Sequence, residues 1–329
     1  MQISSLIDII DGRLLNSPSI SFIYSFKTDP TKVNEGDLFI AKTINDIPLA
    51  VENGAFAIVT QEVHPIIDKE IAWIKVLDID LSLIQLIRFK LANYSLQAYI
   101  CNSATYSLLK LYSNSSSKNL KFLSNDLNDF IKNIDDIQDN DILISKDKEL
   151  LEKIYPNVNL FNKNNLSYEN LVEHSLFEVS FTYKDIYFSK LRLSKIYIRD
   201  FLSVYDFLDL ELDLSKLKAF KYFKPLFLDK SLEIIEFGKS DKFIITQNDN
   251  SLVKNEINYL ENRFTYAKTL YLTSKYNSNL DSKQTIVKTM DELKKALKEN
   301  SFNAAYIIGF KYDDISKALQ KLEKQASLF

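Results

Sequence analysis

The fold is decided by residues 28–41, which read TDPTKVNEGDLFIA, and by the segment that follows them. Asp37 to Ala41 predicts a short buried strand, because a brief apolar run beside turn residues is typical of a sheet interior. A short helix follows, with Asp46 as a plausible N-cap. Gly54 can take the left-handed conformation that ends such a helix, and the apolar run 55–60 predicts the next strand. Strand, helix and strand in this order indicate a largely parallel α/β layer.

The same alternation of strand and helix signals continues along the chain. Strands are expected at residues 72–77, 96–100, 141–145, 269–273 and 304–308. A hairpin is expected from 177–183 and 186–193, and a strand pair from 232–237 and 242–246. Helices are expected at residues 82–94, 106–111, 148–154, 197–208, 251–264, 289–298 and 313–325. We therefore expect an α/β protein with three domains, at residues 1–95, 96–229 and 230–329.

The composition is that of a globular protein without a strongly charged surface. Of the 329 residues, 46% are hydrophobic and 26% charged, and the net charge is −3. Direct nucleic-acid binding is not expected, because it needs a basic stripe to neutralise phosphates. No apolar run approaches the ~20 residues that a bilayer requires, and residues 1–5 lack the features of a signal peptide. We expect Cys101, which ends an apolar strand, to be a small buried hydrophobic residue. It has no second cysteine to pair with, so we expect a cytoplasmic protein.

Two residue types that active sites use are scarce. The chain has five glycines, against an average usage of about 7%, and phosphate-binding loops need glycine because the backbone must approach the anion closely. The two histidines, His64 and His174, leave little material for metal binding or acid–base chemistry. We expect His64 in a loop and His174, beside Glu173, on a helix surface. No metal and no cofactor is expected.

Residues 28–41 resemble the N-terminal signature of the Mur ligases, roughly D-S-R-x-V-x-P-G-D-L-F-V-A. In that family a segment like A-x-x-x-G-A-x-A-x-V follows, and here residues 50–59 read AVENGAFAIV. Mur ligases are cytoplasmic, ATP-driven enzymes that add amino acids to the UDP-muramoyl-peptide precursor of peptidoglycan. The closest resemblance is to the ligase that adds D-Ala-D-Ala or the third residue. It implies a three-domain architecture, with Asp29, Thr31 and Lys32 as candidate precursor-binding residues.

The central domain of the family opens with a strand and the phosphate loop T-G-S-x-G-K-T-[ST], where this chain has ICNSATYS at residues 100–107. Tyr106 stands in place of the lysine whose ammonium reaches the β- and γ-phosphates, and a tyrosine cannot supply that charge. Both loop glycines are also replaced. The degenerate positions are Asn102, Ser103, Thr105, Tyr106 and Ser107. We therefore predict a central ATPase-like domain that has lost its nucleotide loop.

Three later segments extend the resemblance. Residues 194–202 stand at the family's G-x-H-N-x-x-N motif without its histidine and asparagines, and residues 209–223 resemble its L-G-I-D-L-E-x-I-K-x-A-L-x-x-F segment. Residues 225–251 stand at the entrance to a Rossmann-like C-terminal domain. No segment resembles the one that carries the family's carbamylated lysine and magnesium-binding histidine. The resemblance thus implies a shortened central domain.

Three classes of function follow. The first is a catalytically inactive Mur-ligase-like protein that binds a peptidoglycan precursor or regulates cell-wall enzymes. The alternative is a scaffold protein, because residues 325–329, QASLF, resemble the peptide that docks into the bacterial sliding clamp through residues equivalent to Gln325, Leu328 and Phe329. The second alternative is an active ATP-dependent ligase with a divergent site.

Overall fold

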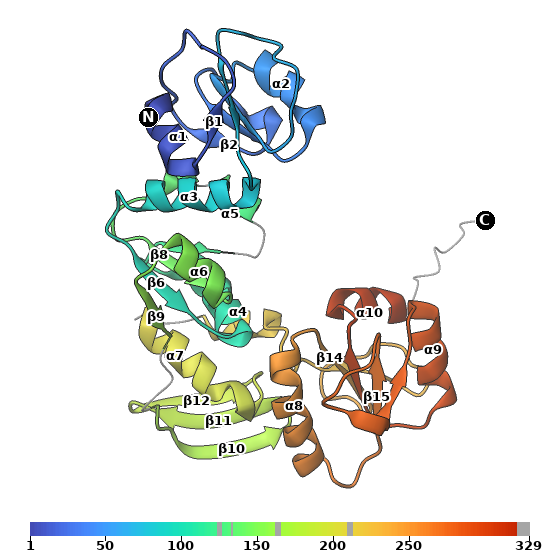
Figure 1. Cartoon of the computed structure of the whole chain (residues 1–329). Coiled ribbons are helices and arrows are strands. Elements are labelled where there is room, and N and C mark those ends of the chain that lie inside the picture. Colours follow the sequence, from blue (N-terminus) through green and yellow to red (C-terminus); the bar gives the residue numbers. More distant parts are fainter. Residues whose placement is uncertain (124–126, 133, 162–165, 209–212, 321–329) are drawn as a thin grey trace, which may run out of the picture. The chain divides into compact units, whose positions relative to one another are not determined.

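The computed structural model describes residues 1–329 except 124–126, 133, 162–165, 209–212 and 321–329. The chain divides into two compact units. One contains Met1–Asn102 and Ser116–Asn162, and the other contains Ser103–Ser115 and Lys163–Phe329. Among the described residues, each unit holds two β-sheets (Figure 1).

The first sheet has five strands in the order β1-β5-β4-β3-β2. Its strands are β1 (Arg13–Leu14), β2 (Phe26–Lys27), β3 (Leu38–Ala41), β4 (Ala57–Thr60) and β5 (Ala72–Lys75). β2 to β5 are parallel, and β1 runs antiparallel to β5. Leu38 and Ile40 share a core with α1 (Ile3–Ile10) and α3 (Ile79–Leu91), whereas Phe39 packs with α2 (Ile47–Glu52). The alternation of β3 side chains between two covered faces explains its continuous apolar sequence.

The second sheet of this unit is parallel throughout, in the order β7-β8-β6-β9. Its strands are β6 (Gln97–Ile100), β7 (Leu120–Phe122), β8 (Ile142–Ser145) and β9 (Val158–Leu160). The neighbouring helices are α5 (Leu127–Ile131) and α6 (Lys148–Ile154), and the Asp147 carboxylate caps α6 by accepting from the Leu150 N–H. Leu143 and Ile154 join the same buried cluster as Leu38 and Ile40.

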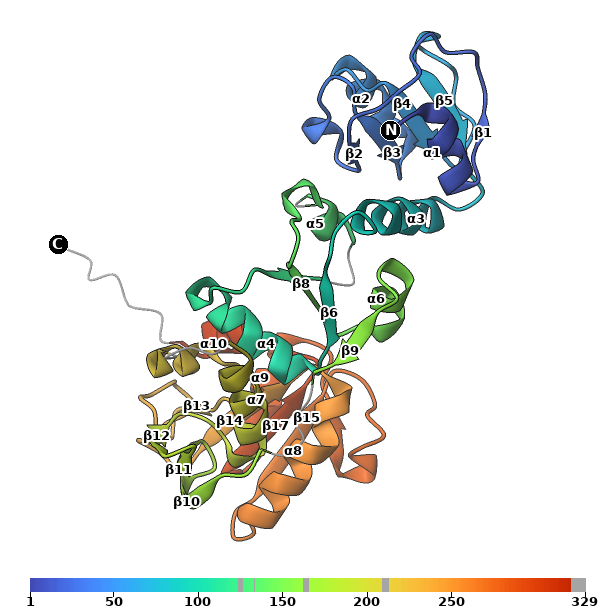
Figure 2. The ribbon, with the colours of Figure 1, turned by 90° about the vertical axis from the view of Figure 1, so that its left-hand side faces the viewer.

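The second unit contains a three-stranded antiparallel sheet of β10 (Glu169–Ser175), β11 (Glu178–Tyr183) and β12 (Ile186–Leu191). The β11–β12 turn is Lys184-Asp185, and both residues have positive φ, 49° and 63°, as the tight turn of a two-residue hairpin requires. Beside this sheet lie α4 (Ser103–Tyr112) and α7 (Ile198–Leu208), which pack against each other (Figure 2).

The C-terminal sheet has the strand order β13-β14-β17-β15-β16. Its strands are β13 (Leu226–Phe227), β14 (Phe243–Gln247), β15 (Thr269–Thr273), β16 (Gln284–Ile286) and β17 (Ala304–Ile308), and all but β13 are parallel. The helices of this sheet are α8 (Asn250–Arg263), α9 (Met290–Glu299) and α10 (Tyr312–Leu319) (Figure 1). Because β17 returns between β14 and β15, the carboxyl ends of these three strands meet at one edge of the sheet.

Most of the expected elements are present, and the predicted α/β class is confirmed. Three predictions were wrong. Glu173 and His174 lie on strand β10 instead of a helix. Residues 232–237 form no strand; β13 pairs with β14 instead, which leaves 232–237 as a connecting loop. Cys101 is partly exposed, not buried.

Candidate functional site

The degenerate phosphate-loop positions lie at the start of α4. β6 ends at Ile100 and α4 begins at Ser103, so only Cys101 and Asn102 connect them. The first N–H groups of a helix have no intrahelical partners and favour a bound anion. A two-residue connection without glycine, however, is too short to wrap backbone around a phosphate group.

A buried carboxylate lies beside the first turn of α4. The hydroxyl of Thr105, which is 0% exposed, donates a hydrogen bond of 2.7 Å to Oδ1 of Asp200 in the first turn of α7. Asp200 itself is 5% exposed. Ser103 is also buried and its side chain interacts with Tyr222, whose pKa is raised by burial and partly lowered again by this contact. The resemblance to the family's phosphate loop would place a lysine and a bound phosphate at this first turn of α4. Here the buried carboxylate of Asp200 lies beside the turn.

Two further predicted positions follow Thr105 on the same helix. Tyr106 and Ser107 are both half-buried on α4. The structure thus places the five predicted residues on one short segment, and brings only Ser103 and Thr105 into the packed interior of the second unit. Asp200 belongs to the 194–202 segment that aligns with the family's G-x-H-N-x-x-N motif.

The candidate precursor-binding residues form a local turn. Asp29 accepts hydrogen bonds from the Thr31 N–H (3.0 Å) and the Thr31 hydroxyl (2.7 Å), which caps the 3₁₀ helix Pro30–Lys32. These bonds lower the pKa of Asp29. Asn53 anchors the turn by donating to the Pro30 carbonyl oxygen (2.9 Å), and Lys32 is exposed. The three predicted residues are therefore adjacent, but Asp29 and Thr31 satisfy each other.

A hollow of about 300 Å³ lies at the carboxyl ends of β3 and β4, and part of its lining follows this turn closely in the sequence. It is lined by residues 41–45, 60–62 and Ile79. Lys42 contributes its ammonium group, which is 3.2 Å from the carboxylate of Asp80. Crevices at the carboxyl ends of parallel strands are where open α/β sheets bind ligands.

A second polar crevice was not predicted from the sequence. It measures about 510 Å³ at the carboxyl ends of β14, β15 and β17, and its walls are Asn248, Asn250, residues 274–279 and residues 308–309. Asn277 is held there by donating to Asn250 Oδ1 (2.9 Å). Gly309 has a φ of +91°, and a Cβ at this position would lie 1.9 Å from Ser274 Oγ. The run of Ser and Asn after the predicted strand 269–273 was the available signal.

A buried carboxylate also lies inside the second unit. Glu256 on α8 is 0% exposed, and it accepts hydrogen bonds from the hydroxyls of Tyr197 and Tyr306 (2.5 Å for Tyr306) and from Gln247 Nε2 (2.7 Å). Burial raises the pKa of Glu256 to about 7, and the three hydrogen bonds offset part of that rise. Tyr197 precedes α7, so this cluster joins the α7 segment to the C-terminal sheet.

The described part of the chain lacks two kinds of feature. No group of three or more His, Cys, Asp or Glu side chains is arranged to hold a metal ion there. No helix within the described ranges is both long and apolar enough to cross a membrane. The predicted clamp-binding residues Gln325, Leu328 and Phe329 lie outside the described residues.

The whole-chain comparison with solved structures decides the fold. A MurF ligase from Thermotoga maritima in complex with ADP aligns with a TM-score of 0.55 and 14% identity, over 90% of this chain and 96% of that chain. A MurF from Acinetobacter baumannii aligns with a TM-score of 0.52 and 11% identity, over 93% of this chain and 95% of that chain. The chain has the Mur ligase fold.

This finding confirms the resemblance and the fold class expected from residues 28–41. No protein-family model and no curated protein sequence matches the chain. The Mur ligase fold is therefore present with little of the sequence that normally accompanies it, and fold alone does not establish an activity.

Proposed function

We propose that this chain is a Mur-ligase-fold protein without ATP-driven ligase activity, which acts by binding a peptidoglycan precursor or by regulating cell-wall enzymes. The observation that carries the proposal is the buried Thr105–Asp200 pair at the start of α4. In an active nucleotide loop, glycine backbone and a lysine ammonium surround the phosphates. Here Tyr106 stands at the lysine position, and the buried carboxylate of Asp200 accepts a hydrogen bond from Thr105 in the same turn.

The charge of Asp200 also disfavours a phosphate group at this position. Two unit charges about 4 Å apart repel each other by about 4 kcal/mol at an effective dielectric constant of 20. That energy corresponds to a roughly thousandfold loss of affinity. A phosphate group placed at the first turn of α4 would meet the Asp200 carboxylate without a lysine to compensate. The ADP complex of the Thermotoga maritima MurF has the same fold, so it is the matched positive control.

Precursor binding is the more specific part of the proposal. The hollow at the carboxyl ends of β3 and β4, with Lys42 in its wall, supports it. A UDP-muramoyl-peptide carries a diphosphate, which an ammonium group can bind as a point charge. The Asp29–Lys32 turn supports it less, because Asp29 and Thr31 are bonded to each other.

Thermal unfolding with and without UDP-muramoyl-peptides tests precursor binding. We expect the precursor to raise the melting temperature, because a ligand that binds only the folded state stabilises it. Lys42→Gln should abolish the rise, and Lys69→Gln, which removes an exposed charge outside the hollow, should leave it unchanged. An unchanged melting temperature at saturating precursor would contradict precursor binding and leave regulation through protein partners.

A further inference from the structure

A small cavity in the second unit is walled by positive charges. It lies where the end of β12 meets the 3₁₀ helix η6 (Leu214–Ala219), and it has a volume of about 50 Å³. Arg192, Lys218 and Lys224 all line it. Since one water needs about 10–15 Å³ on this measure, the cavity holds about three to five waters. That is the room a single phosphate or carboxylate group needs.

Among the described residues these three cations make no ion pair within 4 Å, although the carboxylates of Asp213 and Asp313, which do not line the cavity, attract Lys218 and Lys224 from further away. The Arg192 guanidinium lies 4.5 Å from the centre of the Phe237 ring. The Lys224 ammonium donates to the Lys218 carbonyl oxygen (2.7 Å) and lies over the Tyr312 ring. Burial and the positive charges of Lys221 and Arg192 lower the pKa of Lys224, and the negative charge of Asp313 offsets part of this effect. The cavity therefore has an excess of positive charge.

A buried hydroxyl in the same wall points independently to a ligand. Ser194 also lines the cavity and is 3% exposed. Its Oγ makes no hydrogen bond of normal geometry with any residue that the structure describes. The Tyr259 hydroxyl interacts with it more loosely, but is itself hydrogen-bonded to Glu173 (3.3 Å). Buried hydroxyls are normally paired, and the loose contact with Tyr259 is one that the Ser194 hydroxyl can exchange for a ligand in this cavity.

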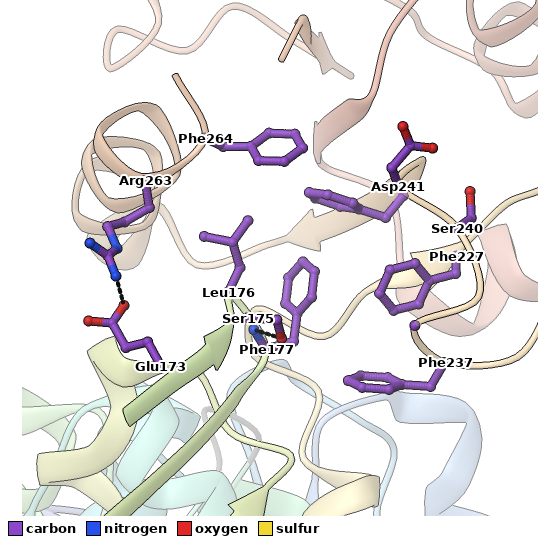
Figure 3. A pocket seen from close by; sticks show the side chains of 12 residues that line it. Glu173, Ser175, Leu176, Phe177, Phe227, Phe237, Ser240, Asp241, Arg263 and Phe264 are labelled. Carbon is purple, nitrogen blue, oxygen red and sulfur yellow. Dashed lines mark hydrogen bonds and ion pairs between the residues drawn. The ribbon is translucent and has the colours of Figure 1, made fainter. Parts of the chain in front are cut away.

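A larger aromatic pocket shares two of its walls with the cavity. Phe177 and Phe237 line both, and the larger pocket has a volume of about 420 Å³. Figure 3 shows the rings of Phe177, Phe227 and Phe237 gathered on the pocket wall, while Arg263 is turned toward Glu173 (2.9 Å). Small-molecule sites typically measure roughly 300–1,000 Å³, are mostly apolar and carry a few polar groups.

We propose that the small cavity binds the phosphate or carboxylate group of a small organic ligand, whose apolar part occupies the adjoining aromatic pocket. Arg192, Lys218 and Lys224 supply the positive charge, and the Ser194 hydroxyl supplies a further donor. The phenylalanine rings supply the apolar surface. This site uses none of the residues on which the proposed function depends, so either can fail without the other.

Calorimetric titration of the full chain with phenyl phosphate, benzoate, phenol and inorganic phosphate tests the site. We expect at least one of the two aromatic anions to bind more tightly than both phenol and inorganic phosphate. The tighter of phenyl phosphate and benzoate identifies the anionic group. Lys218→Gln should weaken binding roughly tenfold, as expected for a hydrogen bond to a charged group.

Lys216→Gln is the matched control, because Lys216 lies on the same 3₁₀ helix but does not line the cavity. It should change affinity less than twofold, at about the level of general surface charge. Ser194→Ala should weaken binding with little change in the melting temperature, because its hydroxyl has only the loose contact with Tyr259 to lose. Failure of both aromatic anions to bind would overturn the proposal. Equal losses in Lys216→Gln and Lys218→Gln, or binding of phenol that is as tight as that of both aromatic anions, would also overturn it.

Discussion

Replacing Glu256 by glutamine should change how stability depends on pH. The pKa of Glu256 rises from an ordinary value of 4.5 to about 7 because the side chain is fully buried. One pH unit of pKa difference corresponds to about 1.4 kcal/mol, so ionised Glu256 costs the folded state about 3 kcal/mol above pH 7. Between pH 4.5 and 7 the folded chain binds a proton that the unfolded chain has released. The wild type should therefore become more stable as the pH falls through this window.

Glutamine has a similar shape and no charge, so Glu256→Gln should lack this gain. The tyrosine hydroxyls of Tyr197 and Tyr306 can turn to accept from its amide. Urea unfolding followed by circular dichroism, at intervals from pH 8 to pH 5, measures the free energy of unfolding of each variant. The difference between variants should change by about 2.5 kcal/mol across the range.

Groups that titrate equally in both proteins cancel in that difference. Glu261→Gln is the control on the same helix, because ion pairing with Lys283 lowers the pKa of Glu261 despite partial burial. The stability that ionised Glu261 contributes is lost only as the pH falls below this range. Glu261→Gln should therefore leave the dependence of the unfolding free energy on pH unchanged between pH 8 and 5. Parallel pH profiles for the wild type and Glu256→Gln would refute the assignment of a buried, proton-binding carboxylate.

Three further predictions concern other parts of the chain. Thr105→Val should lower the free energy of unfolding by about 1–3 kcal/mol, because it removes a hydrogen bond to the buried carboxylate of Asp200; urea unfolding measures it, and an unchanged midpoint would count against the pair. Gly309→Ala should lower the melting temperature by several degrees, because its φ is +91° and its Cβ would collide with Ser274; calorimetry that shows wild-type melting would contradict this. Removing residues 325–329 should abolish binding to the purified sliding clamp in a polarisation assay, and equal binding with or without them would make the motif a coincidence.

The local structure was largely predictable because each element carries its own signal. The strands 269–273 and 304–308 and the helix 148–154 have the predicted bounds. The Lys184-Asp185 hairpin also followed from two apolar runs around a two-residue turn. Residues 232–237 were mistaken for a strand because they are apolar, although β13 occupies the sheet edge that they would need.

The partners inside the site could not be predicted because they are distant in sequence. Thr105 and Asp200 are 95 residues apart, and Tyr197 and Glu256 are 59 residues apart. A motif shows which residue has been lost, but only packing shows which side chain has taken its place. The predicted domain boundaries near residues 95 and 229 stay predictions, and limited proteolysis at those positions tests them.

Nucleotide binding at the start of α4 decides between an inactive chain and an active ligase. The measurement is a calorimetric titration of the full chain with Mg-ATP and with ADP, with the Thermotoga maritima MurF as the positive control. Because Tyr106 stands at the lysine position and Asp200 lies beside the first turn of the helix, we expect no measurable heat of binding for this chain. Micromolar affinity for Mg-ATP, particularly if Asp200→Asn leaves it unchanged, would contradict the proposal that the chain lacks ATP-driven activity.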